Sequence, residues 1–379
     1  MKNNDNLQAS PLLMVSKTCV LLVVCTLMSF ANKTYANSSF SIAFGSCARE
    51  TEAQPIWNDI AATKPDAFLF IGDNQYADVR YKNGKRVRGP VTDPARFEQA
   101  YNVLANKPNF KNFREQVPVF MGTWDDHDYG KNDGGKEFSL KQESQAAFLD
   151  FFGFAKDHAL REQAGIYHAE IIENAGHKIQ IIMLDTRYHR DALSQNVNHQ
   201  APNKGPYAPS SDINTSMLGE KQWKWLETEL KKTADVRVIV SSIQVVAFEH
   251  GWEGWGTMPH ERQRLFDLID ETKANGVVFL SGDRHLMEIS KDTGQLGHNT
   301  PYPIWDFTSS GLTQKHAEVN EANTFRVGKV ARQTHYGVVE ILWNEADIMK
   351  SQINMLALGL NNEPIEKVSI SLSELQLSK

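Results

Sequence analysis

The chain has 379 residues, a formal net charge of -6 and a sequence pI near 6.1. This charge balance and the lack of a long basic tract argue against nucleic acid as a partner. The length exceeds that of a usual compact domain, but elaborated α/β enzymes reach it with a single core. We therefore expect one large domain.

The first 36 residues differ in kind from the rest. Lys17 precedes an apolar stretch from Val20 to Phe30, which is short for a membrane span, and small residues surround Ala36. We predict that residues 1–36 are a secretory signal and that residues 37–379 form the mature domain, without a stable membrane anchor. An uncleaved anchor is the alternative. Because no twin-arginine pair is present, we expect export by the general secretory route, to the periplasm or the outside of the cell.

Cys47 is the single cysteine of the predicted mature chain, so no intramolecular disulfide can form. A lone thiol in an oxidising compartment is normally buried or has a task. The segment 40–47 (FSIAFGSC) alternates like a strand that stops at Gly45. Because Cys47 follows directly on the end of this strand, its position favours a task over simple burial.

Three acidic motifs each follow a short apolar run. They are GDNQY (72–76) after residues 67–71, WDDHD (124–128) after 117–121, and GDRH (282–285) after 277–280. Apolar runs this short, bounded by Gly and polar residues, are typical of buried strands, and ligands bind at the carboxyl ends of such strands. Carboxylates that converge there repel each other unless cations neutralise them. The sequence therefore predicts a metal site.

The remaining elements alternate in the manner of a layered α/β protein. We expect further strands at 179–184 and 236–246, amphipathic helices at 219–233 and 261–273, antiparallel strands at 336–343, 347–355 and 366–372, and loops at 81–94 and 195–214. The segment 250–259 (HGWEGWGTMP) is either an aromatic lid over the site or packs its tryptophans on the core.

Together with FGSC (44–47) and LDTRYHR (184–190), these motifs resemble the alkaline phosphatase D family, a branch of the calcineurin-like metallophosphoesterases. The resemblance covers nearly all of the predicted mature chain. It implies an α/β fold in which a two-sheet sandwich is flanked by helices, with metals held at the carboxyl ends of the strands.

The resemblance also implies metal ligands. Asp73 would bridge two metals, Asp126 would bind one of them, and Asp283 and His285 would divide between the two. Tyr76 resembles the tyrosinate ligand of iron-containing relatives. The chain departs from the wider superfamily at two further positions, because Cys47 and Gln244 stand where histidine or carboxylate ligands are expected.

Ligand chemistry turns these assignments into a mixed site. One set of donors, partly soft and anionic, suits Fe3+: Cys47, Asp73, Tyr76 and His285. The other set offers oxygen alone and suits Ca2+: Asp73, Asp126, Asp283 and the side-chain carbonyl of Gln244. Asp125 and Asn132 lie near enough in sequence to add oxygen ligands, and the resemblance implies that calcium can be present more than once. Other divalent metals are the alternative, as is a structural role for Asp73 in a turn or for Tyr76 in the core.

His127 and two arginines complete the predicted site. We expect His127, beside acids that raise its pKa, to act as a general acid oriented by Asp128; a structural histidine is the alternative. Arg187 and Arg284 either bind the substrate phosphate bidentately or pair with a nearby acid.

The predicted function is that of an exported, metal-dependent phosphoesterase of the alkaline phosphatase type, acting on a small phosphate monoester or diester with a metal-activated water. A phosphodiesterase or phospholipase D-like activity on the same site is the alternative. A non-catalytic, secreted calcium-binding module is more remote, because calcium needs only oxygen ligands. An iron redox protein is also remote, because it has no use for an all-oxygen neighbouring site.

Overall fold

The computed structural model describes residues 39–197, 205–315 and 321–377. All of them belong to the unit Asn37–Lys379. The predicted signal segment lies outside the described residues, as does part of the loop expected at 195–214. None of the helices in the described ranges has both the length and the apolar character that a membrane span needs.

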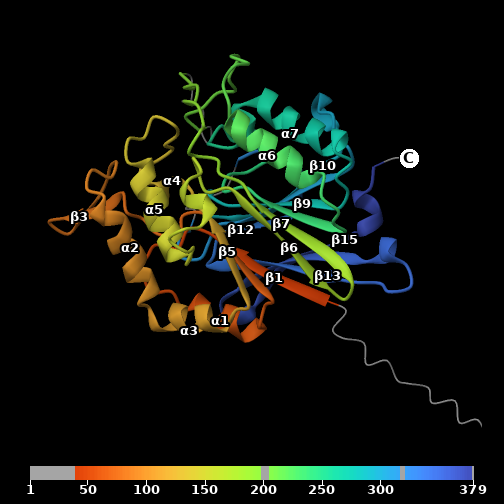
Figure 1. The fold of residues 1–379 in the computed structure, drawn as a ribbon, viewed down its shortest axis with the longest axis horizontal. Coiled ribbons are helices and arrows are strands. Elements are labelled where there is room, and N and C mark those ends of the chain that lie inside the picture. Colours follow the sequence, from red (N-terminus) through yellow and green to blue (C-terminus); the bar gives the residue numbers. More distant parts are fainter. Residues whose placement is uncertain (1–38, 198–204, 316–320, 378–379) are drawn as a thin grey trace, which may run out of the picture. The chain divides into compact units, whose positions relative to one another are not determined.

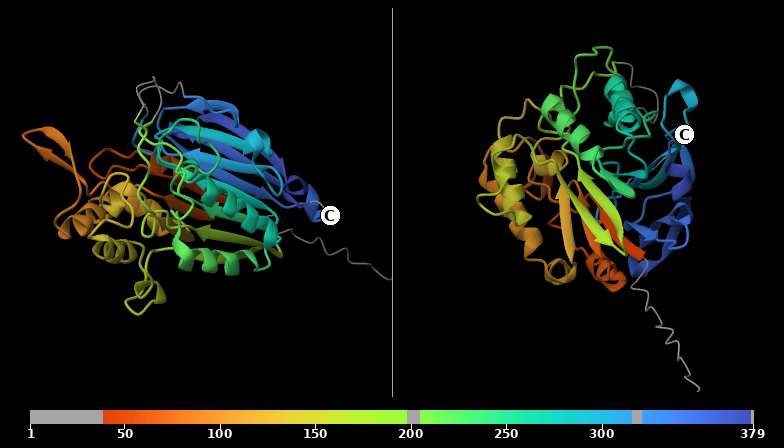
Figure 2. Two further views of the ribbon diagram at one scale, coloured as in Figure 1. Left: turned by 90° about the horizontal axis from the view of Figure 1, so that it is seen from above. Right: turned by 45° about the vertical axis from the view of Figure 1, so that its right-hand side comes forward.

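Two large β-sheets form the centre of the domain (Figures 1 and 2). The first has six strands, in the spatial order β15 (Pro364–Ser371), β14 (Gln352–Gly359), β13 (His335–Leu342), β1 (Ser39–Gly45), β2 (Ala67–Ile71) and β5 (Val119–Thr123). Strands β1, β2 and β5 are parallel, whereas β13, β14 and β15 extend the sheet antiparallel beside β1. The antiparallel closing section predicted for the C-terminal third is confirmed.

The second sheet has seven strands. Their spatial order is β12 (Arg326–Ala331), β10 (Met287–Asp292), β11 (Ile304–Ser309), β9 (Val277–Ser281), β8 (Val236–Val240), β7 (His177–Met183) and β6 (His168–Asn174). Strands β11, β9, β8 and β7 are parallel, and antiparallel strands close both edges. The parallel strands of both sheets are rich in buried Val, Ile, Leu and Phe, as strands covered on both faces require.

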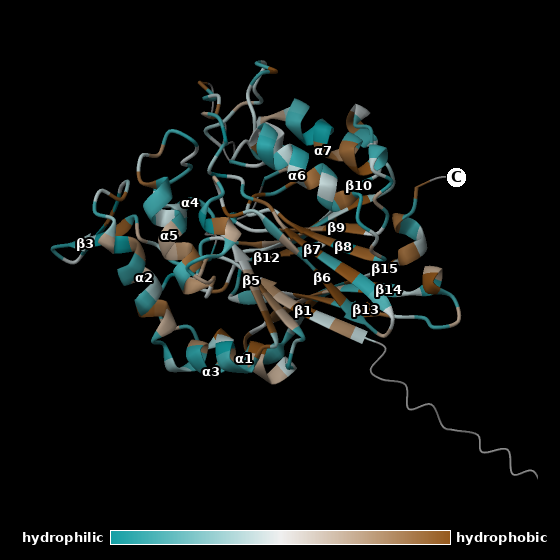
Figure 3. Ribbon diagram, in the orientation of Figure 1, coloured by the Kyte–Doolittle hydropathy of each residue, from teal (hydrophilic) through white to brown (hydrophobic). Residues whose placement is uncertain are grey.

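The two sheets share an apolar core. Side chains alternate across a strand, and in β1 Phe40, Ile42 and Phe44 join the core shared with the second sheet, whereas Ala43 joins the core on the opposite face. Phe44 meets Phe307 of β11 edge to face, with ring centroids 5.0 Å apart. Figure 3 shows the same division, with hydrophobic strands inside and hydrophilic surfaces on the outer helices.

Helices cover the outer faces of both sheets (Figure 1). Those beside the first sheet are α1 (Ile56–Thr63), α2 (Ala95–Ala105), α3 (Pro108–Gln116) and α5 (Lys141–Phe151), and those on the second are α6 (Gly219–Leu230) and α7 (Pro259–Glu271). The two helices predicted from amphipathic patterns are α6 and α7, and α6 buries Trp223, Leu226 and Leu230 as expected. The predicted two-sheet sandwich flanked by helices is confirmed.

Shorter helical segments lie in the connections. They are α4 (Asp126–Tyr129), η1 (Ala159–Arg161), η2 (Trp255–Thr257), η3 (Gln295–Gly297), η4 (Ile348–Lys350), η5 (Leu360–Asn362) and η6 (Leu372–Leu375). Among these, α4 and η2 lie within motifs that the sequence assigned to the site.

The strand predicted at 236–246 is too long. Strand β8 ends at Val240, and the backbone N–H groups of Val245 and Val246 donate to the Asp306 carboxylate, not to a neighbouring strand. A buried carboxylate thus satisfies donors that a sheet would otherwise pair. An apolar run could not reveal this partner, which lies about 60 residues further along the chain.

The segment 81–94, expected to be a loop, contains most of a β-hairpin instead. Strands β3 (Val79–Lys82) and β4 (Lys85–Arg88) pair around Asn83 and Gly84. Both turn residues have positive φ values, 51° and 71°. An Asn-Gly pair readily adopts this conformation and is a strong hairpin signal. The Asn-Gly pair therefore indicates a hairpin, and the expectation of a loop at 81–94 is wrong for residues 81–88.

Candidate metal centre and active site

The motifs singled out in the sequence converge where β1, β2, β5 and β9 end. Asp73 follows β2, Asp125 follows β5 and Asp283 follows β9, although β9 belongs to the other sheet. Gly72 brings two of these motifs into contact, because a Cβ built there would lie 2.6 Å from the Asp125 Cβ. Only glycine permits so close an approach.

Four of the candidate ligands have left-handed backbone conformations. The φ angles are 62° at Cys47, 50° at Asp73, 66° at Asp283 and 55° at His285. Such conformations cost roughly 1–3 kcal/mol per non-glycine residue and cluster at functional sites. Here they occur in the turns that follow β1, β2 and β9, where the donor atoms of the candidate ligands lie close together.

A first cluster joins Cys47, Asp73, Tyr76 and His285. Asp73 Oδ2 lies 2.9 Å from the Tyr76 hydroxyl, which donates to it, and 3.6 Å from Cys47 Sγ. The Tyr76 hydroxyl also lies 3.4 Å from His285 Nε2. Donor atoms of Cys47, Asp73 and His285 fall within 4.8 Å of one another. The four side chains that the sequence assigned to one metal thus lie together.

The electrostatics of this cluster oppose its ionised forms. Burial, followed by repulsion from Asp73, raises the pKa of the Cys47 thiol and of the Tyr76 hydroxyl well above their usual ranges. Burial also lowers the pKa of His285 to about 3, so its imidazole is neutral. A neutral imidazole is a good metal ligand, and a bound cation would deprotonate the thiol and phenol outright.

A second cluster joins Asp125, Asp126 and Asp283. One carboxylate oxygen from each lies within 4.8 Å of the others. Asp125 Oδ2 and Asp126 Oδ1 are buried and have no hydrogen-bond partner among the described residues. Burial and repulsion from Asp125 raise the pKa of Asp283, and burial, against the opposing charge of Arg187, raises the pKa of Asp125 to about 6. Buried carboxylate oxygens without hydrogen-bond partners, in a cluster of three acids, form a donor set that fits a hard cation.

Asp73 lies close to members of both clusters. Besides its contacts in the first cluster, it groups with Asp126 and His127 within the same 4.8 Å limit. Burial, then repulsion from Asp126 and Asp125, raises its pKa well above the usual range. A carboxylate placed between two donor sets is suited to bridge two cations.

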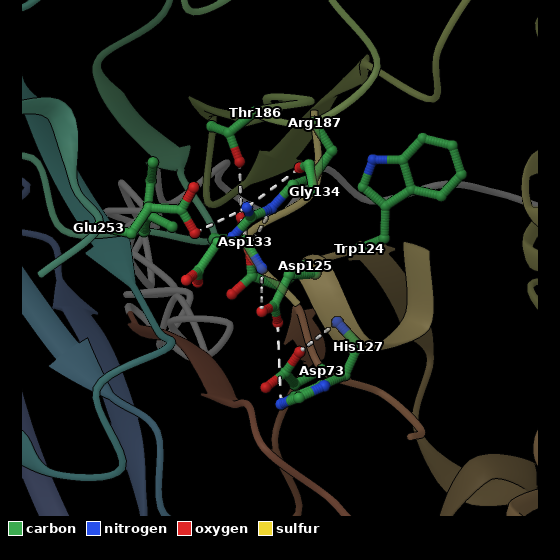
Figure 4. A network of polar contacts seen from close by, with 12 residues as sticks. Asp73, Trp124, Asp125, His127, Asp133, Gly134, Thr186, Arg187 and Glu253 are labelled. Atoms are coloured by element: carbon green, nitrogen blue, oxygen red, sulfur yellow. Dashed lines mark hydrogen bonds and ion pairs between the residues drawn. The ribbon is translucent and has the colours of Figure 1, made fainter. Parts of the chain in front are cut away.

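His127 lies at the junction of the clusters. Its Nδ1 is 2.8 Å from Asp78 Oδ1, its Nε2 is 4.0 Å from Asp126 Oδ1, and its ring packs on Tyr76 with centroids 4.1 Å apart. Its backbone N–H donates to Asp73 Oδ1 at 3.2 Å (Figure 4). Burial acts to lower the pKa of His127, but Asp126 and Asp78 more than offset this effect, so the pKa is raised.

The residue that orients His127 is Asp78, not Asp128. Asp128 accepts from the Asn74 side chain at 2.6 Å and from the Asp125 backbone at 2.6 Å, where it completes the capping box of α4. Adjacent residues of a helical turn point in different directions, so the side chain of Asp128 does not reach the ring of His127. The available signal for Asp78 was its place two residues after Tyr76, in the same strand-end segment.

Arg187 is buried among acids. Its Nε donates to Asp125 Oδ1 at 2.8 Å, with a second, shorter bond from Nη2, and its Nη1 lies 2.7 Å from Glu253 Oε2. Figure 4 shows the guanidinium held between these two carboxylates. The side chain has no exposed surface. Of the two roles that the sequence left open for Arg187, its contacts in the structure are those of the acid pair.

Arg284 also pairs with an acid. Its Nη2 donates to Glu321 at 2.8 Å, and its guanidinium lies 5.1 Å from the ring centroid of Trp252. Trp252 is 39% exposed, whereas Trp255 is fully buried and donates to Ser241. The aromatic segment therefore divides between its two predicted roles, with one tryptophan at the surface and one in the core.

Asn132 and Gln244 make hydrogen bonds to residues that belong to neither cluster. Asn132 Oδ1 accepts a hydrogen bond from Arg88, and the Gln244 amide donates to Glu288 at 2.7 Å and to Thr308 at 2.9 Å. Gln244 Oε1 is buried without a hydrogen-bond partner among the described residues. Its amide nitrogen is thus fixed by the second sheet while its oxygen keeps its lone pairs.

Comparison with known proteins places the chain in a family. Residues 42–346 match the family model of the PhoD-like phosphatases. Alkaline phosphatase D of Bacillus subtilis (strain 168) is 24% identical over 277 residues, which cover 65% of this chain and 46% of that protein. This chain therefore spans less than half the length of that curated relative.

Solved structures share the fold. The structure of PhoD superposes with a TM-score of 0.64 at 18% sequence identity, and the match covers 89% of this chain and 69% of the PhoD chain. A purple acid phosphatase from yellow lupin (Lupinus luteus) seeds gives a TM-score of 0.57 at 11% identity, covering 89% of this chain and 54% of its own. At these identities the likeness concerns the architecture alone.

Proposed function

The chain belongs to the PhoD-like phosphatase family, and from this membership we propose that it hydrolyses phosphate esters at the strand-end site. The observation that carries the proposal is the position of Asp73, which groups with Cys47 and His285 on one side and with Asp126, a member of the second cluster, on the other. Two adjacent cation sites are the arrangement that in-line displacement at phosphorus uses. The substrate is a small phosphate monoester or diester, and the enzyme is of the alkaline phosphatase type.

The donor sets support two different cations. Cys47, Asp73, Tyr76 and His285 would hold Fe3+, because thiolate and phenolate donors suit a trivalent, partly soft ion. A second set, which has oxygen donors only, would hold Ca2+: Asp73, Asp125, Asp126, Asp283 and Gln244. The orphaned Asp125, Asp126 and Gln244 oxygens support this second set. Such cations, when bound, polarise the phosphoryl oxygens and lower the pKa of water.

His127 acts in this proposal as the general acid that protonates the leaving alkoxide. Asp78 accepts from Nδ1 and so leaves the transferable proton on Nε2, on the side of Asp126. Asp126 and Asp78 raise the pKa of His127 despite its burial, which favours the protonated ring that a general acid needs. Asp78 is thus a positioning residue.

A leaving-group series tests this function. His127→Ala should slow alkyl phosphates by about 100- to 10,000-fold and p-nitrophenyl phosphate far less, because only poor leaving groups need a proton in the transition state. His158→Ala, an exposed histidine beside η1, is the matched control and should change neither. Equal losses on both esters would make His127 structural.

A wider assay decides between the remaining alternatives. Protein purified from its native compartment should contain iron and calcium by elemental analysis and hydrolyse members of a panel of monoesters and diesters. Turnover of diesters alone would identify a phosphodiesterase. Hydrolysis of no ester by the metal-loaded protein would overturn the proposed function and favour a calcium-binding module.

We also propose that the protein is exported after cleavage following Ala36, because the N-terminal pattern is that of a secretory signal. N-terminal sequencing of exported material should then begin near Asn37. Recovery of the intact N-terminus would support an uncleaved anchor instead.

A further inference from the structure

The hairpin β3–β4 is an exposed, strongly basic ribbon. No acid occurs from Val79 to Thr92. The same segment contains five cations: Arg80, Lys82, Lys85, Arg86 and Arg88. All residues of β4 are exposed. Within the described part of the chain no carboxylate forms an ion pair with any of the five. The hairpin projects from the domain beside α2 (Figures 1 and 2), and so much unneutralised charge on one short element points to an anionic ligand.

The base of the hairpin is attached to the candidate active site. The Gly89 N–H donates to the carbonyl of Asp78, the residue that bonds His127, at 3.1 Å. Val91 N–H donates at 2.8 Å to the carbonyl of Gly130, which ends α4. Strand β4 therefore leaves its charges beside the loop that carries the general acid.

Arg88 is the cation of the hairpin that lies nearest to this loop. It donates to Asn132 Oδ1, four residues beyond Asp128 in the same loop. Arg284, the other arginine near this loop, is paired with Glu321, whereas Arg88 lies on the exposed strand β4.

Strand register divides the cations between two faces. Val79 pairs with Arg88, and Tyr81 with Arg86, so Arg86 and Arg88 share the face of Val79, which is 5% exposed and therefore turned toward the domain. The other face carries Arg80, Lys82 and Lys85. One face of the ribbon thus carries two guanidinium groups, of which Arg88 bonds Asn132 in the loop after α4, and the other face carries the remaining three cations.

We propose that Arg86 and Arg88 bind a second anionic group, a carboxylate or phosphate, carried by the alcohol part of the substrate. This inference rests on the proposed phosphoesterase function and adds a specificity to it. A guanidinium binds carboxylate or phosphate oxygens through two parallel hydrogen bonds, which selects a charged leaving group over a neutral one. The buried Arg187 cannot serve this purpose, because Asp125 and Glu253 already occupy its donors.

The test compares two substrates that differ by one charge, phenyl phosphate and 4-carboxyphenyl phosphate. For the double variant Arg86→Met/Arg88→Met, the ratio of the KM for the carboxylated ester to that for phenyl phosphate should rise by about 10- to 100-fold, the usual effect of losing charge-assisted hydrogen bonds. Arg86→Lys/Arg88→Lys should give an intermediate ratio, because it keeps the charge and loses the fork.

The control is Lys82→Met/Lys85→Met, which removes the same charge from the opposite face and should leave the ratio within about twofold, because exposed charges at a distance are screened. An equal rise in both double variants, or no change in the arginine variants, would overturn the inference while hydrolysis itself persists. If the wild-type protein hydrolyses neither ester, the proposed function fails, and this specificity with it.

Discussion

Replacing Arg187 should destabilise the protein strongly. Arg187→Met keeps much of the side-chain volume but removes the guanidinium that pairs with Asp125 and with Glu253, both at most 2% exposed. Arg190 still pairs with Glu253 in the variant, so Asp125 is the carboxylate that loses its cation. Breaking a buried pair from one side leaves uncompensated charge and costs about 3–5 kcal/mol. For a domain of this size the loss corresponds to a fall in Tm of roughly 4–7 °C.

The assay is denaturant unfolding of wild type and variant under identical metal conditions. Arg264→Met is the control, because Arg264 also makes two bonds to one acid, Glu220, but in an exposed pair, which is worth about 0–1 kcal/mol. Its contact with the buried Glu261 is longer, at 3.3 Å, and Glu261 keeps its bonds to Ser216, Met217 and Trp223 in the variant. A loss at Arg187 no larger than that at Arg264 would refute the reasoning. An unchanged stability with a raised KM would instead return Arg187 to the phosphate-binding role that the sequence left open.

Three further predictions concern the site. Asp78→Asn should lower kcat for alkyl phosphates about 100-fold or more. It should also move the basic limb of the pH–rate profile to lower pH, because His127 loses the carboxylate that raises its pKa; an unshifted profile would argue against Asp78. Burial raises the pKa of Asp125 to about 6, so in metal-stripped protein the free energy of unfolding should fall as the pH rises from about 4 to 6 and this carboxylate ionises. Added calcium should therefore raise Tm more near pH 7.5 than near pH 5. Equal increases in Tm at the two pH values would contradict the prediction. The iron-loaded protein should absorb visible light through the Tyr76 phenolate, and Tyr76→Phe should abolish the band while Cys47→Ser weakens iron retention; colourless iron-loaded protein would rule out this site.

The sequence alone determined the positions of the site residues along the chain. Buried parallel strands must be short apolar runs, and the polar residues that follow them must lie at the sheet edge. Asp73, Asp283 and His285 could be located on this basis, and the four-residue set around Cys47 is assembled as the resemblance and ligand chemistry implied. The β3–β4 hairpin can also be predicted from nearby residues alone, because two adjacent residues, Asn83 and Gly84, set its turn.

Only the tertiary structure decided which polar groups partner one another. Asp78 bonds a histidine 49 residues away, and Arg187 bonds a carboxylate 62 residues away. In sequence, Asp128 was the nearer choice for His127, but the first turn of α4 directs it to the cap and to Asn74. Hydrogen bonds and ion pairs act over a few ångströms in space, so once distant strand ends are brought together, the nearest partner in the chain need not be the nearest partner in the fold.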